Sequence, residues 1–87
     1  MFKITGGKGF HMEFKNGYTI SVQFGPMNYC SNRSMEYGAV ARPASETTEI
    51  ADWDKRGLNV KFHNGDTVLG HVTADELVSY INEISSR

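Results

Sequence analysis

The sequence predicts an α+β fold: an antiparallel sheet of about five strands built from hairpins, with one C-terminal helix packed on it. The motif Phe-x-Asn-Gly-x-Thr, followed by a β-branched residue, occurs at 14–20 and again at 62–68. Asn-Gly between alternating apolar residues is a strong hairpin signal. Residues 73–84 combine a capping box with an apolar stripe, which predicts the helix. At 87 residues the chain has room for one core, so we expect a single domain over 1–87.

Composition and charge exclude several classes of function. The chain carries nine Lys and Arg against ten Asp and Glu, a formal net charge of -1. Nucleic-acid-binding proteins usually carry a basic stripe, so we expect no bulk nucleic-acid binding. The single cysteine rules out an intrachain disulfide and fits a reducing cytosol. No segment approaches the roughly 18 apolar residues of a membrane helix, and the N-terminal residues lack an apolar signal stretch. We therefore expect a cytoplasmic protein with no membrane partner.

Residues 10–24 predict the first hairpin. Apolar and polar residues alternate on both sides of Asn16-Gly17, which is the period of a strand. A two-residue loop would mix the two faces, whereas a three-residue loop over 15–17 keeps the apolar face whole. The longer loop pairs Phe14 with Tyr18, Met12 with Ile20, and Phe10 with Val22. It corresponds to a type I turn closed by a left-handed glycine, so we expect a positive φ at Gly17.

The middle of the chain predicts two further strands. Residues 35–42 form one strand that ends at Pro43, because proline cannot donate to a sheet ladder. Residues 47–53 form the other, which is interrupted at 54–57. Together with the hairpins, these segments give the expected sheet of about five strands.

The second Asn-Gly copy predicts a second hairpin in the register of the first. The pattern pairs Phe62 with Asp66 and Val60 with Val68 across a three-residue loop. Gly65 then takes the left-handed conformation that we expect for Gly17. This interpretation also predicts a strand over 58–62.

The C-terminal segment predicts the helix. Thr73 is placed as the N-cap, and Glu76 completes a capping box three residues later. The residues that follow at helical spacing form one apolar stripe: Leu77, Tyr80, Ile81 and Ile84. We expect this stripe to cover one face of the sheet and to leave the other face exposed to solvent or to a partner.

A polar, aromatic loop over 25–33 is the best candidate site, because no hairpin requires it and function concentrates in loops. Its candidate binding residues are Asn28, Tyr29, Cys30, Asn32 and Arg33. Arg33 can grip a carboxylate or phosphate, and Tyr29 can stack on a base or fill a pocket of a partner. The alternative is a loop folded by its own Asn side chains, with Tyr29 and Cys30 in the core.

Trp53 is the second candidate binding position. It is flanked by Asp52, Asp54, Lys55 and Arg56, and an aromatic residue surrounded by charge is a common composition of interface anchors. The alternative is a core tryptophan at the end of a strand.

The sequence offers little support for catalysis or metal binding. A nucleophilic Cys30 needs a histidine within hydrogen-bonding reach, and His11, His63 and His71 are all distant in sequence. A lone cysteine is more often a buried, inert thiol. The histidines and the cysteine lack the paired short spacing of zinc sites. We therefore expect no enzyme, no metal and no cofactor.

Four segments resemble a pattern in small uncharacterised proteins of tailed bacteriophages and prophages. They are residues 16–33, 49–54, 65–70 and 74–77, in that order. The resemblance implies a phage accessory protein expressed in a bacterial cytoplasm. It brings no catalytic residues with it.

The leading functional hypothesis is a non-enzymatic module that binds a host or phage protein through the loop over 25–33 and modulates host defence or metabolism. The alternative is sequestration of a small anionic ligand, such as a nucleotide, by Arg33 and Tyr29 at the interface of a homo-oligomer. A structural role in the virion also remains open, because small sheets can assemble through their edges.

Overall fold

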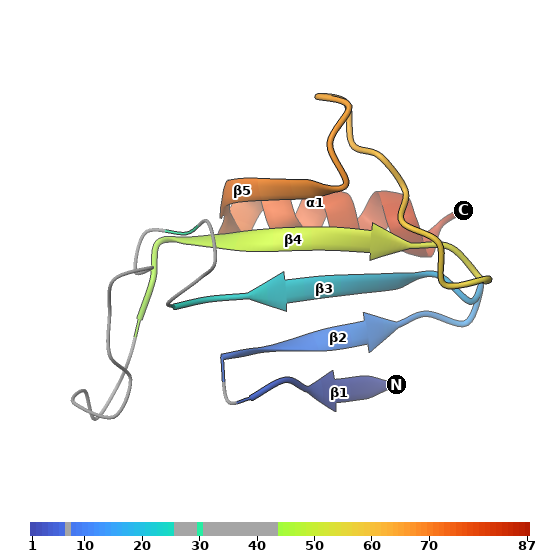
Figure 1. Cartoon of the computed structure of the whole chain (residues 1–87), viewed down its shortest axis with the longest axis horizontal. Coiled ribbons are helices and arrows are strands. Elements are labelled where there is room, and N and C mark those ends of the chain that lie inside the picture. Colours follow the sequence, from blue (N-terminus) through green and yellow to red (C-terminus); the bar gives the residue numbers. More distant parts are fainter. Residues whose placement is uncertain (7, 26–29, 31–43) are drawn as a thin grey trace.

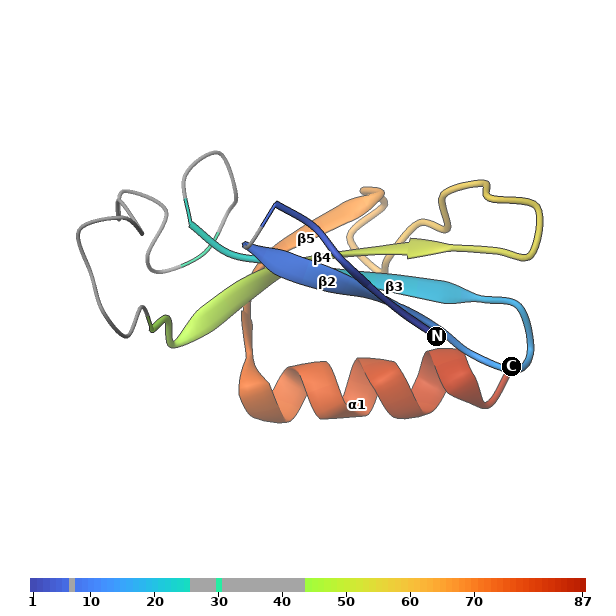
Figure 2. The same ribbon diagram turned by 90° about the horizontal axis from the view of Figure 1, so that it is seen from below.

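A computed structural model describes residues 1–6, 8–25, 30 and 44–87. It contains one antiparallel sheet in the order β1-β2-β3-β4-β5, with helix α1 packed on one face (Figures 1 and 2). The elements are β1 (Phe2–Ile4), β2 (Gly9–Glu13), β3 (Thr19–Gln23), β4 (Thr47–Trp53), β5 (Val68–Thr73) and α1 (Ala74–Ser85). The predicted α+β fold is confirmed. The strand predicted over 35–42 lies outside the described residues.

The first hairpin has the predicted register. Strands β2 and β3 pair Phe10 with Val22 and Met12 with Ile20. The Phe14 backbone N–H donates to the Tyr18 carbonyl at 2.9 Å, which closes the three-residue loop. Gly17 has a φ of 88°, the left-handed conformation that this loop requires.

Strand β1 is an element that the sequence analysis did not predict. It pairs antiparallel with β2, so that Lys3 lies opposite His11. The connection is a tight turn, in which the Thr5 backbone N–H donates to the Gly9 carbonyl at 3.0 Å. Gly9 is packed so closely that an added Cβ would lie 2.0 Å from the Val22 carbonyl oxygen. Gly6, which has a φ of 57°, and the closely packed Gly9 therefore build this hairpin.

The second Asn-Gly copy forms the predicted turn but not the predicted hairpin. The Phe62 backbone N–H donates to the Asp66 carbonyl at 2.8 Å, and Gly65 has a φ of 84°. No described ladder pairs Val60 with Val68, however, because both lie along the same edge of β4. Val60 N–H donates to the Asp52 carbonyl, whereas Val68 pairs with Ala51.

The strand predicted over 58–62 is accordingly reduced to one isolated bridge, between Asn59 and Trp53. A turn over 54–58 brings the chain back along β4, with Gly57 in the left-handed conformation at φ 79°. The segment 61–67 then leaves the sheet before β5 resumes the same edge (Figure 1).

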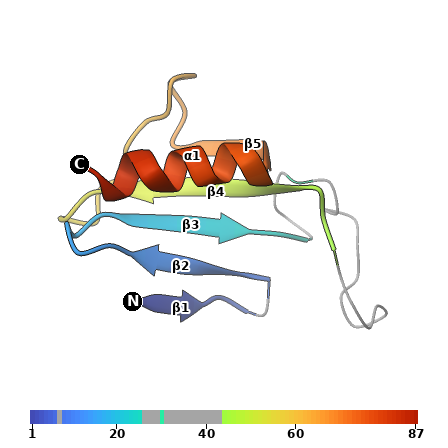
Figure 3. The ribbon, with the colours of Figure 1, turned by 180° about the vertical axis from the view of Figure 1, so that it is seen from behind.

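Helix α1 covers β3, β4 and β5 and leaves β1 and β2 without helical contact among the described elements (Figure 3). The capping box of Thr73 and Glu76 is present as predicted. The buried core cluster consists of Ile20, Val22, Ile50, Val72 and Ile84, and the predicted stripe residues Leu77, Tyr80 and Ile81 pack against it. The end of the helix is tied to the first hairpin, because the Asn16 side chain donates to the Ile84 carbonyl at 2.8 Å.

Candidate functional site

Most of the predicted loop site lies outside the described residues: Asn28, Tyr29, Asn32 and Arg33. Cys30 is described and is 1% exposed. Its Sγ lies 3.9 Å from the Gly25 carbonyl oxygen, to which the thiol donates. Burial makes a thiol a poor nucleophile, since only the charged thiolate attacks. Binding by the other four residues stays a prediction.

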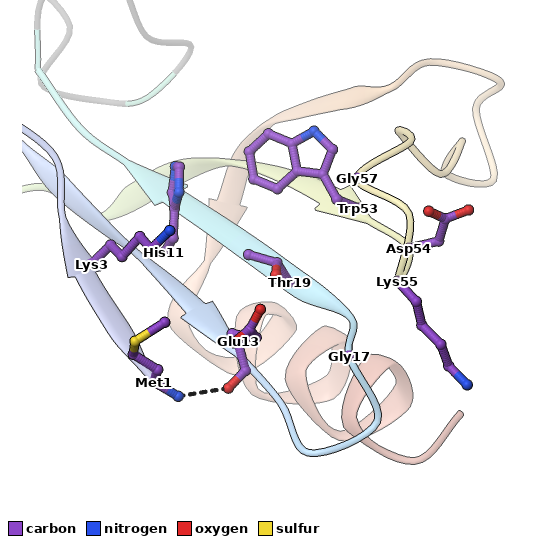
Figure 4. A pocket seen from close by; sticks show the side chains of 10 residues that line it. All are labelled: Met1, Lys3, His11, Glu13, Gly17, Thr19, Trp53, Asp54, Lys55 and Gly57. Atoms are coloured by element: carbon purple, nitrogen blue, oxygen red, sulfur yellow. Dashed lines mark hydrogen bonds between the residues drawn. The ribbon is translucent and has the colours of Figure 1, made fainter.

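Trp53, the other predicted binding residue, lies on the open face of the sheet, which we define as the face opposite helix α1. Pairing of β3 with β4 places Trp53 opposite Thr19, and pairing of β2 with β3 places His11 opposite Ser21. The two rings lean toward each other across β3, with centroids 5.0 Å apart and planes at 57°. Figure 4 shows both rings on the same side of the sheet. The strand register thus assembles an aromatic pair from residues 42 positions apart.

The small side chains of the central strands make this contact possible. Thr19, Ser21 and Ala51 occupy the open face between the two rings. Ser21 is only 4% exposed, although α1 lies on the other side of the sheet. Larger residues at these positions would hold the rings apart. The small residues therefore leave space above the sheet, and the two rings meet in that space. All of these residues belong to regular strands.

A hollow of about 300 Å³ lies beside the ring pair, and we call it the open-face hollow. It is lined by Met1, Lys3, His11, Glu13, Gly17, Thr19, Trp53, Asp54, Lys55 and Gly57 (Figure 4). The lining combines an aromatic surface with two lysines and two carboxylates. The aromatic surface can stack on a planar ring, and the lysines can donate hydrogen bonds to an anion.

The two carboxylates of the open-face hollow differ in their engagement. Asp54 accepts backbone hydrogen bonds from Leu58 at 3.0 Å and Arg56 at 2.8 Å, and its other oxygen pairs with the Arg56 guanidinium at 3.1 Å. The hydrogen bond from the Leu58 backbone is the main reason that the pKa of Asp54 lies below its usual value. Glu13 takes part in no ion pair between described residues. Asp54 is therefore a turn residue, whereas Glu13 remains available to a ligand.

Gly17 positions one of the lysines. A Cβ at Gly17 would lie 2.9 Å from Cγ of Lys55, so the aliphatic part of Lys55 passes directly over this glycine. Gly17 is required by the turn, and its lack of a side chain also leaves space for Lys55 at the edge of the hollow.

A buried ion pair lies on the opposite face and has a structural role. Asp52 is 1% exposed, and its Oδ2 accepts from the Arg87 guanidinium at 2.8 Å. Burial raises the pKa of Asp52 above its usual value, although the hydrogen bond and the charge of Arg87 oppose that shift. Arg87 also lies over the Tyr18 ring, 5.2 Å from its centroid. The pair fastens the end of α1 to the sheet.

The three histidines do not converge. His11 contacts Trp53, His63 Nδ1 lies 3.4 Å from the Tyr80 hydroxyl, and His71 is exposed in β5 with a φ of 53°. Across the part of the chain that the structure describes, no three His, Cys, Asp or Glu residues are grouped as a metal site requires. In that same part, no helix is long and apolar enough to span a membrane.

Comparisons with protein-family models, with curated proteins and with solved structures found no match to this chain.

Sequence reasoning identified Trp53 but missed His11, which contacts it, and Lys3, which lines the same hollow. The sequence analysis considered His11 as a partner for Cys30, whereas the structure places it on the open face beside Trp53. The signal that distinguishes it is the run of small residues on the polar face of β3 and β4, namely Thr19, Ser21 and Ala51. Such a run predicts that longer side chains on the flanking positions meet over it.

Proposed function

We propose that this protein is a non-enzymatic binding module that captures a protein partner on the open face of its sheet. The observation that carries the proposal is the packing of Trp53 on His11 on the face opposite α1, which is the one helix of the described residues. The hydrophobic core is complete without this pair, because the buried cluster lies on the other side of the sheet. Half-buried aromatic residues with charged neighbours are typical anchors of protein interfaces.

The rigidity of the surroundings also supports a binding role. Trp53 ends β4 and is held on one side by its pairing with Thr19 and on the other by its bridge to Asn59. These pairings fix the backbone that carries the ring, and the contact with His11 restrains the ring itself, so less conformational entropy is lost when a partner covers it. The open face is therefore suited to recognition without rearrangement.

The resemblance to small phage and prophage proteins supports a biological setting for this activity. In our proposal the partner is a host or phage protein of a bacterial cytoplasm, and binding modulates host defence or metabolism. The loop over 25–33 supplies a second contact region in this proposal.

The test is capture of proteins from bacterial lysate by the immobilised chain and by its Trp53→Ala variant. We expect the variant to lose the captured protein. Val78→Ala is the matched control, because Val78 is also an apolar residue, is 57% exposed, and lies on the helix, away from the open face. Equal capture by wild type and Trp53→Ala would contradict the proposal.

A further inference from the structure

The open-face hollow also has the properties of a small-ligand site. Its volume of about 300 Å³ is at the lower end of the range for small-molecule pockets, which is about 300–1,000 Å³. A ligand of this size is a single small molecule no larger than about one mononucleotide. A polynucleotide or a dinucleotide would extend well beyond the hollow.

The ring pair supplies a surface for a planar group. The planes of Trp53 and His11 are tilted by 57°, so the pair forms a wedge and not a closed stack. The floor beneath it is polar, because Thr19 and Ser21 lie there. A heteroaromatic ring fits this combination, since it has both a stacking face and hydrogen-bonding edges.

Lys3 supplies positive charge beside the rings. The pairing of β1 with β2 places Lys3 opposite His11, and Figure 4 shows its side chain extending toward that histidine. Lys55 extends away from Trp53 in the same view. No ion pair between described residues engages either lysine. Lys3 is therefore the cation best placed to meet an anionic group on a ring that rests against Trp53.

Glu13 adds a carboxylate to the lining of the open-face hollow. It lies beside Met1 (Figure 4) and is paired with Thr19, which is itself paired with Trp53. A carboxylate repels an anion and accepts hydrogen bonds from hydroxyl or amino groups. The hollow thus presents the Lys3 ammonium group, on the residue paired with His11, and the Glu13 carboxylate as a hydrogen-bond acceptor.

We propose that the open-face hollow binds a nucleoside monophosphate. The base rests in the wedge of Trp53 and His11, the phosphate meets Lys3, and a ribose hydroxyl donates to Glu13. The site lies within one chain and needs neither Arg33 nor a second protomer. The binding is distinct from protein capture, although both use the same aromatic pair.

The experiment is an NMR titration of the ¹⁵N-labelled protein with adenosine monophosphate, with adenosine and inorganic phosphate as separate component probes. We expect adenosine monophosphate to shift the amides of Lys3, His11 and Thr19 and the indole N–H of Trp53. Trp53 is the only tryptophan, so quenching of its fluorescence gives an independent readout of the same site. Adenosine should shift the same signals more weakly, and phosphate alone should act mainly at Lys3.

Variants separate the contributions of charge and ring. Lys3→Ala should weaken binding of adenosine monophosphate about tenfold, the equivalent of about 1.4 kcal/mol, and leave adenosine binding unchanged. Lys3→Arg should bind adenosine monophosphate as wild type does. Lys61→Ala is the matched control, because Lys61 is an exposed lysine that lies outside the open-face hollow, and it should have no effect.

Three results would overturn the inference: no shift at millimolar nucleotide, shifts confined to other regions, or a Lys3→Ala variant that binds as wild type does. The capture experiment with Trp53→Ala is scored separately. If Trp53→Ala loses capture but the wild-type protein binds no nucleotide, the proposed protein partner stands and the nucleotide site is wrong. If the wild-type protein binds nucleotide but Trp53→Ala captures as wild type does, the nucleotide site stands and the proposed protein capture is wrong.

Discussion

The two faces of the sheet are made by alternate residues of the same strands, but they differ in burial and in composition. In β3, Ile20 and Val22 point toward the helix and are 0% and 1% exposed. Thr19 and Ser21, which alternate with them, lie on the open face. The covered face gathers the aliphatic core. The open face gathers small polar residues, two lysines and a pair of aromatic rings.

This difference indicates which residues the fold needs for stability. A side chain on the covered face is fixed by burial, and its removal leaves a cavity. Trp53 and His11 lie outside that core and still form an ordered contact. A half-buried aromatic pair on the face opposite α1 contributes little to the core, and in our proposal it serves recognition.

The largest expected effect is on the covered face. Ile20→Ala should lower the free energy of unfolding by about 4 kcal/mol, because it removes buried methyl groups at the centre of the core. Ser21→Ala, the next residue along the same strand but on the open face, should change it by less than about 1 kcal/mol. Urea denaturation of both variants measures the difference. Similar losses would show that the two faces contribute equally to stability.

A somewhat smaller effect is expected at the ion pair that fastens the helix. Arg87→Ala should destabilise the fold by about 3 kcal/mol at pH 7, because it leaves the buried Asp52 carboxylate without its cation. Arg87 is partly exposed, so we expect the lower end of the range for buried pairs.

The pH dependence of the Arg87→Ala variant sharpens this prediction. The pKa of Asp52 is raised in the fold, so protonation of this group stabilises the folded state, and that contribution is lost as pH rises through the folded pKa. Without Arg87 the pKa of Asp52 rises further. The deficit of the variant relative to wild type should therefore shrink as the pH is lowered toward 4. A deficit that stays constant with pH would contradict the role of Asp52.

The third effect compares two glycines in equivalent turns. Gly17 and Gly65 have φ values of 88° and 84°, so alanine is strained at both. At Gly65 an added Cβ meets nothing within 4 Å, whereas at Gly17 it meets Lys55. We expect Gly65→Ala to cost about 1 kcal/mol and Gly17→Ala about 2 kcal/mol. Thermal unfolding of the two variants measures both costs, and equal values would remove the packing role of Gly17.

The sequence predicted the first hairpin to its register because two signals agreed there. The Asn-Gly turn and the alternation of apolar residues both required a three-residue loop, and only one register keeps Met12 and Ile20 on one face. The helix was equally predictable, because Thr73 and Glu76 define its start. Local chemistry and burial point to the same answer in these segments.

Two other elements were not predictable for physical reasons. Strand β1 has three residues, too few to show alternation, and it is fixed by pairing with β2. Residues 58–62 alternate as a strand does, but the turn that ends at Leu58 and the resumption of the edge at Val68 leave them room for one bridge only. Residues 58–62 and β5 compete for the same edge of β4. The outcome depends on the assembled sheet and cannot be read from the local sequence.

The candidate site was predictable only in part. Trp53 was identified from the charges around it in sequence. His11 and Lys3 join it through strand pairing, so their role emerges only once the registers of three strand pairs are known.

The central claim is that the open face serves recognition while the covered face serves stability, and Trp53→Ala tests it most directly. The measurement is partner capture by the folded variant, with its free energy of unfolding determined in parallel. We expect capture to fall at least tenfold while stability falls by only about 1.5 kcal/mol, the worth of the aromatic pair. Undiminished capture by the folded variant would contradict the claim.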